Sequence, residues 1–157
     1  MQHRTGSVTD FDFLHGDWTV TNRRLRVRWV RCDEWDVFTG QHRCEPRLGG
    51  VVNVDQMDVP ERGWSAMSLR SFDVEQRRWS IWWITDAAGR LEPPVHGGFD
   101  GDVGVFEGDD VDGDVPVGVR FHWDVIDPDH ARWQQSFSRG DDVWETKRKA
   151  FEVLAAQ

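Results

Sequence analysis

Thr9-Asp10-Phe11-Asp12-Phe13-Leu14-His15-Gly16-Asp17-Trp18 is the stretch that decides the fold of this chain. Either of its first two residues can cap a short helical turn, and Phe11 and Leu14 lie three residues apart on one side of that turn. Gly16 can adopt the left-handed conformation that ends the turn. Because Trp18 follows directly and begins a strand-like segment, we expect an apolar turn that leads straight into the first strand.

The residues after Trp18 divide into short segments with the alternation of β-strands, separated by tight turns. The pattern predicts strands over residues 19–30, 34–44, 48–55, 64–72, 78–85, 117–126, 131–139 and 143–153, with short pieces of strand between 95 and 114. The Asp-Gly pairs at 100–101 and 112–113 are strong turn signals. Nine or ten sequential strands predict an all-β fold. We expect an up-and-down antiparallel barrel, since closure removes exposed sheet edges, with a β-sandwich as the competing architecture.

Length and charge limit the classes of function. The chain has 157 residues, which predicts a single domain over 1–157, with residues 1–8 as a flexible tail. A net charge of −9 argues against partners such as nucleic acids and anionic membranes, which select basic surfaces. No apolar run is long enough to span a bilayer, and the first residues lack the apolar core of a signal peptide. We expect a cytoplasmic protein and leave its oligomeric state open, with a homodimer among the options.

Arginines occupy every second position from residue 24 to residue 28, on the same strand face as Asn22. A short hairpin link at 31–33 would place Asp36 and Glu34 opposite the last two of these arginines. Cross-strand pairs of opposite charge are stabilising. We therefore predict that this stripe is an ion-paired outer face and not an anion site.

The same hairpin separates the two cysteines, Cys32 at the turn and Cys44 at the far end of the returning strand. Bridged cysteines have Cα atoms within about 7 Å of each other, and twelve residues of strand reach much farther. We predict two free thiols.

The opening stretch and the strand pattern together resemble the calycin superfamily of lipocalin-like β-barrels, whose N-terminal signature is an apolar turn, Gly-x-Trp and a strand. Here Gly16 and Trp18 match that signature. In lipocalins a basic residue of the last strand lies across this tryptophan. The resemblance assigns that role to the basic cluster 147–149, and among these to Arg148, because a guanidinium stacks well on an indole ring.

Four further phrases resemble uncharacterised bacterial lipocalin-like domains, a family without an established activity. They lie at residues 13–18, 49–55, 79–83 and 131–138. Nitrobindins, which are haem-binding calycins, are more distantly similar and ligate iron through a histidine near the C-terminal end. This chain has no histidine after His130, so we expect no haem and predict no other cofactor.

The chain contains 10 Trp and 9 Phe but no Tyr. Each ring can bury about 150–250 Å², so these rings either fill the core or line a pocket for a flat or apolar ligand. Polar residues on otherwise apolar faces would orient such a ligand, or would satisfy one another in a filled barrel. The predicted ligand-binding residues are His42, Asn53, Arg70, Trp83, His96, Trp123 and Gln135.

Other kinds of site find little support. The histidines lack the close spacing of metal ligands, and the acidic stretch 109–114 does not match the calcium-binding loop of EF-hands, so we predict no metal site.

Three hypotheses about function follow from these residues. The first hypothesis is binding of a small, mostly apolar molecule. The second is an isomerase- or cyclase-type enzyme on the same barrel, with His42 or His96 and Asp55 as acid and base. The third is a protein-interaction module whose surplus tryptophans form an exposed patch.

Overall fold

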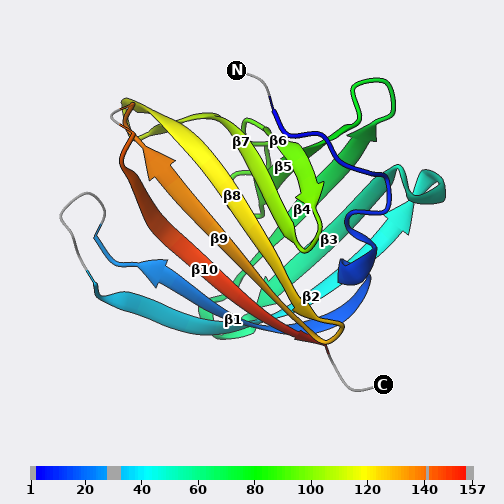
Figure 1. Ribbon diagram of the computed structural model, residues 1–157. Helices are drawn as coiled ribbons and strands as arrows, with labels where there is room; N and C mark the ends of the chain where they lie inside the picture. Colours follow the sequence, from blue (N-terminus) through cyan, green and yellow to red (C-terminus); the bar gives the residue numbers. More distant parts are fainter. Residues whose placement is uncertain (1–2, 28–32, 141, 155–157) are drawn as a thin grey trace.

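The chain forms a closed barrel of ten antiparallel β-strands, which a computed structural model describes over residues 3–27, 33–140 and 142–154. Each strand is hydrogen-bonded to its neighbours in sequence, and β1 is also bonded to β10 (Figure 1). The strands are β1 (Gly16–Leu25), β2 (Trp35–Arg47), β3 (Val52–Val59), β4 (Trp64–Asp73), β5 (Arg78–Thr85), β6 (Val95–Asp100), β7 (Val103–Asp112), β8 (Val115–Asp127), β9 (His130–Ser138) and β10 (Trp144–Leu154). The predicted up-and-down barrel is confirmed, and the β-sandwich alternative is wrong.

The described helical elements are three short 3-10 turns, η1 (Asp12–Leu14), η2 (Leu48–Gly50) and η3 (Pro60–Arg62). No helix in the described part of the chain has the length and apolar character needed to cross a membrane. The element η1 is the predicted N-terminal turn, but its N-cap residue is Phe11 and no side chain caps it. The expected capping role of residues 9 and 10 is therefore wrong. Gly16 follows the turn with a φ of 127°, a value that favours glycine.

The link between β2 and β3 differs from the prediction. Strand β2 continues through Pro46, and β3 begins only at Val52. The paired glycines form the connecting turn, with φ of 70° at Gly49 and 104° at Gly50, and they make no bulge within a strand. Pro46 is accommodated near the end of β2, where a missing backbone donor costs little.

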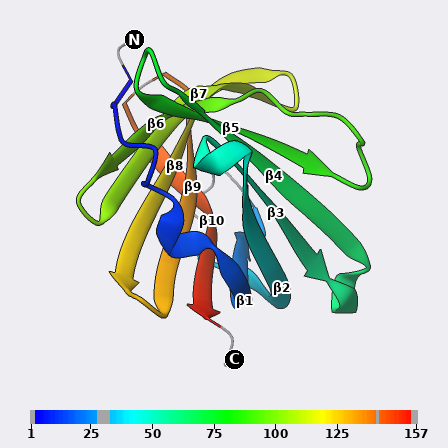
Figure 2. The same cartoon turned by 90° about the vertical axis from the view of Figure 1, so that its right-hand side faces the viewer.

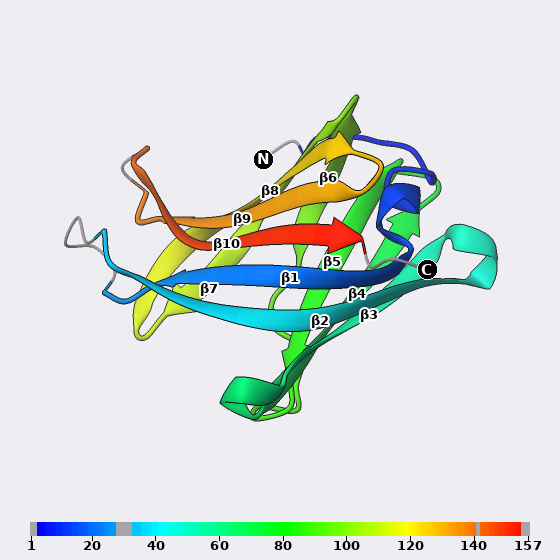
Figure 3. The same ribbon diagram turned by 90° about the horizontal axis from the view of Figure 1, so that it is seen from below.

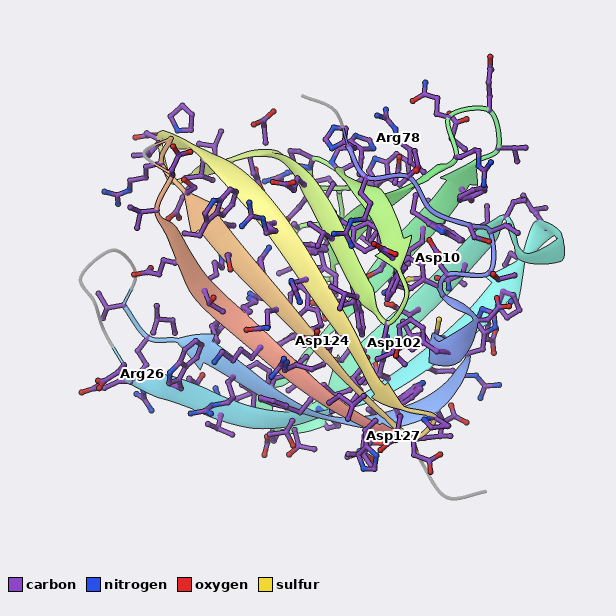
Figure 4. The ribbon with its side chains drawn as sticks, in the orientation of Figure 1. Asp10, Arg26, Arg78, Asp102, Asp124 and Asp127 are labelled. Carbon is purple, nitrogen blue, oxygen red and sulfur yellow. The ribbon has the colours of Figure 1, made fainter. Side chains whose placement is uncertain are left out.

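The two ends of the barrel differ. Asp127, at the end of β8, marks the closed end, and Arg26, just beyond β1, marks the open end (Figure 4). At the closed end the N-terminal segment and η1 run across the barrel (Figure 2). Phe11, Leu14 and Trp18 are fully buried there, and Trp18 Nε1 donates a hydrogen bond of 2.8 Å to the Leu14 carbonyl. The apolar turn therefore plugs this end, and Trp18 forms its floor.

Residues of the segment before η1 are hydrogen-bonded to the barrel. The Gly6 amide donates to the Arg77 carbonyl, and Trp79 Nε1 donates to the Ser7 carbonyl. A Cβ at Gly98 would lie 2.7 Å from the backbone of Thr5, so the close approach of this segment to β6 requires glycine.

Asp10 joins this N-terminal segment to the sheet (Figure 4). Its Oδ2 accepts hydrogen bonds from the Ser7 amide at 3.0 Å and from the Phe99 amide of β6 at 3.1 Å. The residue expected to cap a helical turn therefore anchors the whole segment to β6.

Strand alternation corrects the prediction that the arginine stripe forms an outer face. Trp18 and Val20 face the interior, so Asn22 and Arg24, at the next alternate positions, face it too and cannot form an outer face. The register pairs Asp36 with Arg24 instead of Arg26, and Arg28 lies outside the described residues.

Arg148 lies opposite Arg24, whereas Trp18 lies opposite Leu154 at the other end of β10. Figure 3 shows β10, β1 and β2 side by side along this wall. Arg148 therefore cannot lie across Trp18, because six residues of extended strand span roughly 20 Å.

Replacing Phe11 with alanine should lower the free energy of unfolding by about 3–5 kcal/mol, because the ring is fully buried against several others. Its ring packs edge-on against Trp79 and Phe99 at centroid distances of 5.2 and 5.3 Å. Urea denaturation measures the change. Val74→Ala, in the exposed β4–β5 turn, is the control and should change stability little; equal effects of the two substitutions would contradict the plug.

Candidate functional site

A cavity lies inside the barrel between the Trp18 floor and the open end. Its aromatic wall consists of Phe38, Trp64, Trp83, Phe121, Trp123 and Trp133. The space between the walls measures about 670 Å³ with the open mouth included, but the centre of a water molecule reaches only about 50 Å³ of it. The cavity is therefore narrow.

Four charged side chains gather at the base of this cavity, each nearly inaccessible to solvent: His42, Asp55, Arg70 and Glu152. His42 Nε2 lies 3.0 Å from Asp55 Oδ2, and His42 Nδ1 contacts Glu152 Oε1. Arg70 Nη2 lies 2.5 Å from the same Asp55 oxygen. We call these four residues the basal cluster.

The carboxylates of the basal cluster control the charge of His42. Burial by itself would lower the pKa of this imidazole, but Glu152 and Asp55 outweigh burial and raise the pKa to about 10. Burial would likewise raise the pKa of Asp55, but Arg70 and His42 outweigh it and hold that pKa well below its usual range. At neutral pH His42 therefore keeps its proton, and Asp55 is an ionised carboxylate between His42 and Arg70.

Further contacts fix the position of Arg70. Its Nη1 donates to Asn53 Oδ1 at 2.9 Å, and its guanidinium carbon lies 4.9 Å from the centre of the Phe11 ring. Asp55 Oδ1 accepts a hydrogen bond from the Ser68 amide at 2.9 Å. The basal cluster is therefore connected both to the plug at the closed end and to the backbone of β4.

Some polar atoms of this region have no hydrogen-bond partner among the described residues. They are Glu152 Oε2, Asn53 Nδ2 and Arg70 Nε, all buried. Buried polar atoms are nearly always paired, with protein or with water. These atoms mark polar groups at the base of the barrel that the described residues leave unpaired.

The structure brings four of the predicted ligand-binding residues together. His42, Arg70, Trp83 and Trp123 all line the cavity. Asn53 is buried behind Arg70, to which it is hydrogen-bonded.

Gln135 lies beyond this group, in an adjoining cavity. That second cavity shares Trp83, Phe121, Trp133 and Arg148 with the first. Gln135 is therefore an interior residue near the mouth and not part of the basal cluster.

His96 is not part of the site, which corrects the prediction. Val95 and Gly97 are buried on one face of β6, so His96 points to the outside. Its Nδ1 lies 2.7 Å from Ser80 Oγ on the neighbouring strand. An enzyme that used His96 with Asp55 is therefore excluded by geometry.

Glu152 is the site residue that the sequence analysis missed. It alternates with Ala150 and Leu154 on the last strand, where two apolar neighbours on the same face indicate an inward position. The closure of the barrel then brings it to His42, a contact between residues 110 positions apart that no local pattern reveals.

The predictions of free thiols and of no metal site can be compared with the same region of the barrel. Cys44 is a free, buried thiol beside Arg70, and burial raises its pKa to about 12. Cys32 lies outside the described residues, so the prediction of two free thiols is confirmed only for Cys44. Within the described ranges no group of three or more His, Cys, Asp and Glu side chains is arranged to hold a metal ion.

Comparison of the chain with protein-family models and with curated proteins gives no match. The site is therefore interpreted from its own geometry and chemistry.

His42 should make the stability of the protein depend on pH above neutrality. Because its pKa rises from 6.5 to about 10 on folding, its stabilising contribution is complete below pH 6.5 and is lost as the pH rises through about 10. We expect the free energy of unfolding to fall by about 1 kcal/mol per pH unit between pH 7 and 9 from this group. Urea denaturation at pH 7, 8 and 9 measures the slope.

Two variants test this assignment. His42→Gln should remove the dependence of stability on pH between pH 7 and 9. It should also lower the free energy of unfolding by about 3–5 kcal/mol, because Glu152 loses its counter-charge. The double variant His42→Gln/Glu152→Gln should recover part of that loss. His130→Gln, at the exposed start of β9, is the control and should keep the slope. A slope that His42→Gln leaves unchanged would contradict the assignment.

Proposed function

We propose that this protein binds a small, flat, mostly apolar molecule inside the barrel. The observation that carries the proposal is the cavity walled by six aromatic rings above the basal cluster. Apolar walls with a few convergent polar groups are typical of small-molecule sites. The rings supply contact area, and the unpartnered polar atoms at the base offer hydrogen bonds that would fix the orientation of the ligand.

The aromatic wall is held by packing, which supports a preformed site. Phe121 and Trp133 pack edge to face at a centroid distance of 5.1 Å, on the neighbouring strands β8 and β9. Trp123 and Trp133 are also directly opposite each other across these strands. Binding to such a wall requires little ordering of side chains, so less of the contact energy is lost on association.

We also propose that the chain is a calycin-like protein, and the barrel architecture supports this assignment. The supporting features are the apolar turn, the tryptophan floor at Gly16–Trp18 and the ten-strand closure. The absence of Arg148 from the floor is a departure from the lipocalin pattern, in which a basic residue covers this tryptophan.

The other two hypotheses find less support. His42 contacts a carboxylate at each ring nitrogen, so it retains its proton at neutral pH and is poorly suited to act as a general base. An interaction patch of exposed tryptophans has no counterpart in the described ranges, where every tryptophan is buried or half-buried. Trp29 lies outside those ranges.

Isothermal titration calorimetry with 2-naphthamide, a flat neutral probe, tests the proposal. We expect saturable binding with one site per chain. Trp83→Leu should weaken the affinity about tenfold, because Trp83 lines the cavity and its ring provides contact area.

Trp82→Leu is a matched control on the adjacent residue, which lies on the opposite face of β5. Its affinity for 2-naphthamide should equal that of the unaltered protein. Heats that do not saturate, or equal losses in the two variants, would overturn the proposal.

A further inference from the structure

Four basic residues form one wall of the cavity near its open end. Arg24 of β1 and Arg148 of β10 lie directly opposite each other on the inward face, and Arg23 and Lys149, also opposite each other, border the same cavity from the alternate positions of these strands. We call them the cationic wall. It stands in a chain whose net charge is −9, so it runs against the overall charge of the protein.

The pairing within the cationic wall works against stability. Arg23 is opposite Lys149, and Arg24 is opposite Arg148, so two cross-strand pairs bring like charges together. Like charges directly opposite on neighbouring strands are destabilising. Departures of this kind from the rules of stable folding are expected at functional sites.

A β-bulge strengthens the positive character of this region. The register between β9 and β10 shifts between Thr146 and Arg148, which leaves Lys147 as the extra residue. As a result two consecutive side chains, Lys147 and Arg148, both line the adjoining cavity, although strand alternation would turn one of them away.

Acidic side chains also lie near the wall. Asp36 Oδ2 lies 3.6 Å from Arg24 Nη2. Both carboxylate oxygens of Asp36 also accept shorter hydrogen bonds, of 2.7 and 2.6 Å, from Arg62. Glu92 lines the adjoining cavity together with Arg148. Seven basic and five acidic side chains line the two cavities, in contrast to the acidic excess of the whole chain.

One atom of the wall also lacks a partner. Arg23 Nε is buried and has no hydrogen-bond partner among the described residues. The guanidinium of Arg23 and the ammonium of Lys149 both lie over the Trp35 ring, at 5.5 and 5.3 Å from its centre. These contacts hold the two cations in place.

We infer that the ligand of this cavity is an organic anion, with a flat apolar body against the aromatic wall and a carboxylate or similar oxyanion at the cationic wall. This inference rests on the proposed binding function and adds the charge of the ligand and its orientation. The anionic group lies toward the open end, because the carboxylates of the basal cluster occupy the closed end. A guanidinium matches the geometry of an oxyanion, and a cleft with an excess of one charge concentrates the field that attracts its ligand.

The test compares 2-naphthoate with 2-naphthamide, which has nearly the same shape but no charge. Calorimetry at pH 7 and low ionic strength should show about tenfold tighter binding of 2-naphthoate, the effect of one charge-assisted hydrogen bond. Raising the salt concentration to about 0.3 M should reduce this preference, because exposed charges near the mouth are screened.

Arg24→Gln and Arg148→Gln should each reduce the preference for 2-naphthoate over 2-naphthamide several-fold. Arg43→Gln removes the same charge from the exposed outer face of β2 and should keep the full preference. Thermal unfolding checks that each variant is folded. If Arg24→Gln or Arg148→Gln does not fold, Lys149→Gln takes its place as the variant that removes one charge from the cationic wall.

The outcomes separate this inference from the proposed function. Equal affinity for the two probes would overturn the inference and leave the proposed function standing. Failure of both probes to bind would overturn both. An equal loss of preference in Arg43→Gln would assign the effect to overall charge and would overturn the role of the cationic wall.

Discussion

The pairing of β1 with β10 is the constraint on which the rest of the structure depends. It closes the sheet and thereby decides which side of every strand faces the interior. Through β1 it also brings together the strands that flank it: His42 of β2 lies opposite Trp18, and Glu152 of β10 lies opposite Val20. The basal cluster therefore exists only in the closed barrel. The same pairing places like charges opposite one another at the open end.

Closure also explains how four charged groups can be buried beneath an aromatic wall. An isolated charge in such a place would be very costly, but opposite charges in direct contact offset much of that cost. Each positive group of the basal cluster contacts a carboxylate, and Asp55 contacts both positive groups. The plug of aromatic rings below keeps water away from this network. Polar and apolar parts of the interior thus depend on each other, since the Phe11 ring lies against the Arg70 guanidinium.

Much of the fold and part of the site follow from local patterns. Alternation and turn signals predicted nine or ten strands and most of their positions. They also placed Asn53, Asp55 and Arg70 on otherwise apolar faces, and all three are buried in the structure. The ends of the strands were harder to predict. Pro46 and the paired glycines give the same local signal whether a strand ends before them or after them. His96 was misplaced because its segment is short and rich in glycine, so the inward face of β6 is not evident without its neighbours.

The sequence by itself determined an all-β meander, an apolar turn leading into Gly16–Trp18, and a surplus of rings able to line an interior. These depend on strand periodicity and on side-chain chemistry, both of which are local properties. Only the tertiary structure decided that Glu152 meets His42 and that Arg148 lies opposite Arg24, far from Trp18. Those contacts depend on the register between the first and last strands. Register is set by the closure of the whole barrel, and no short segment contains that information.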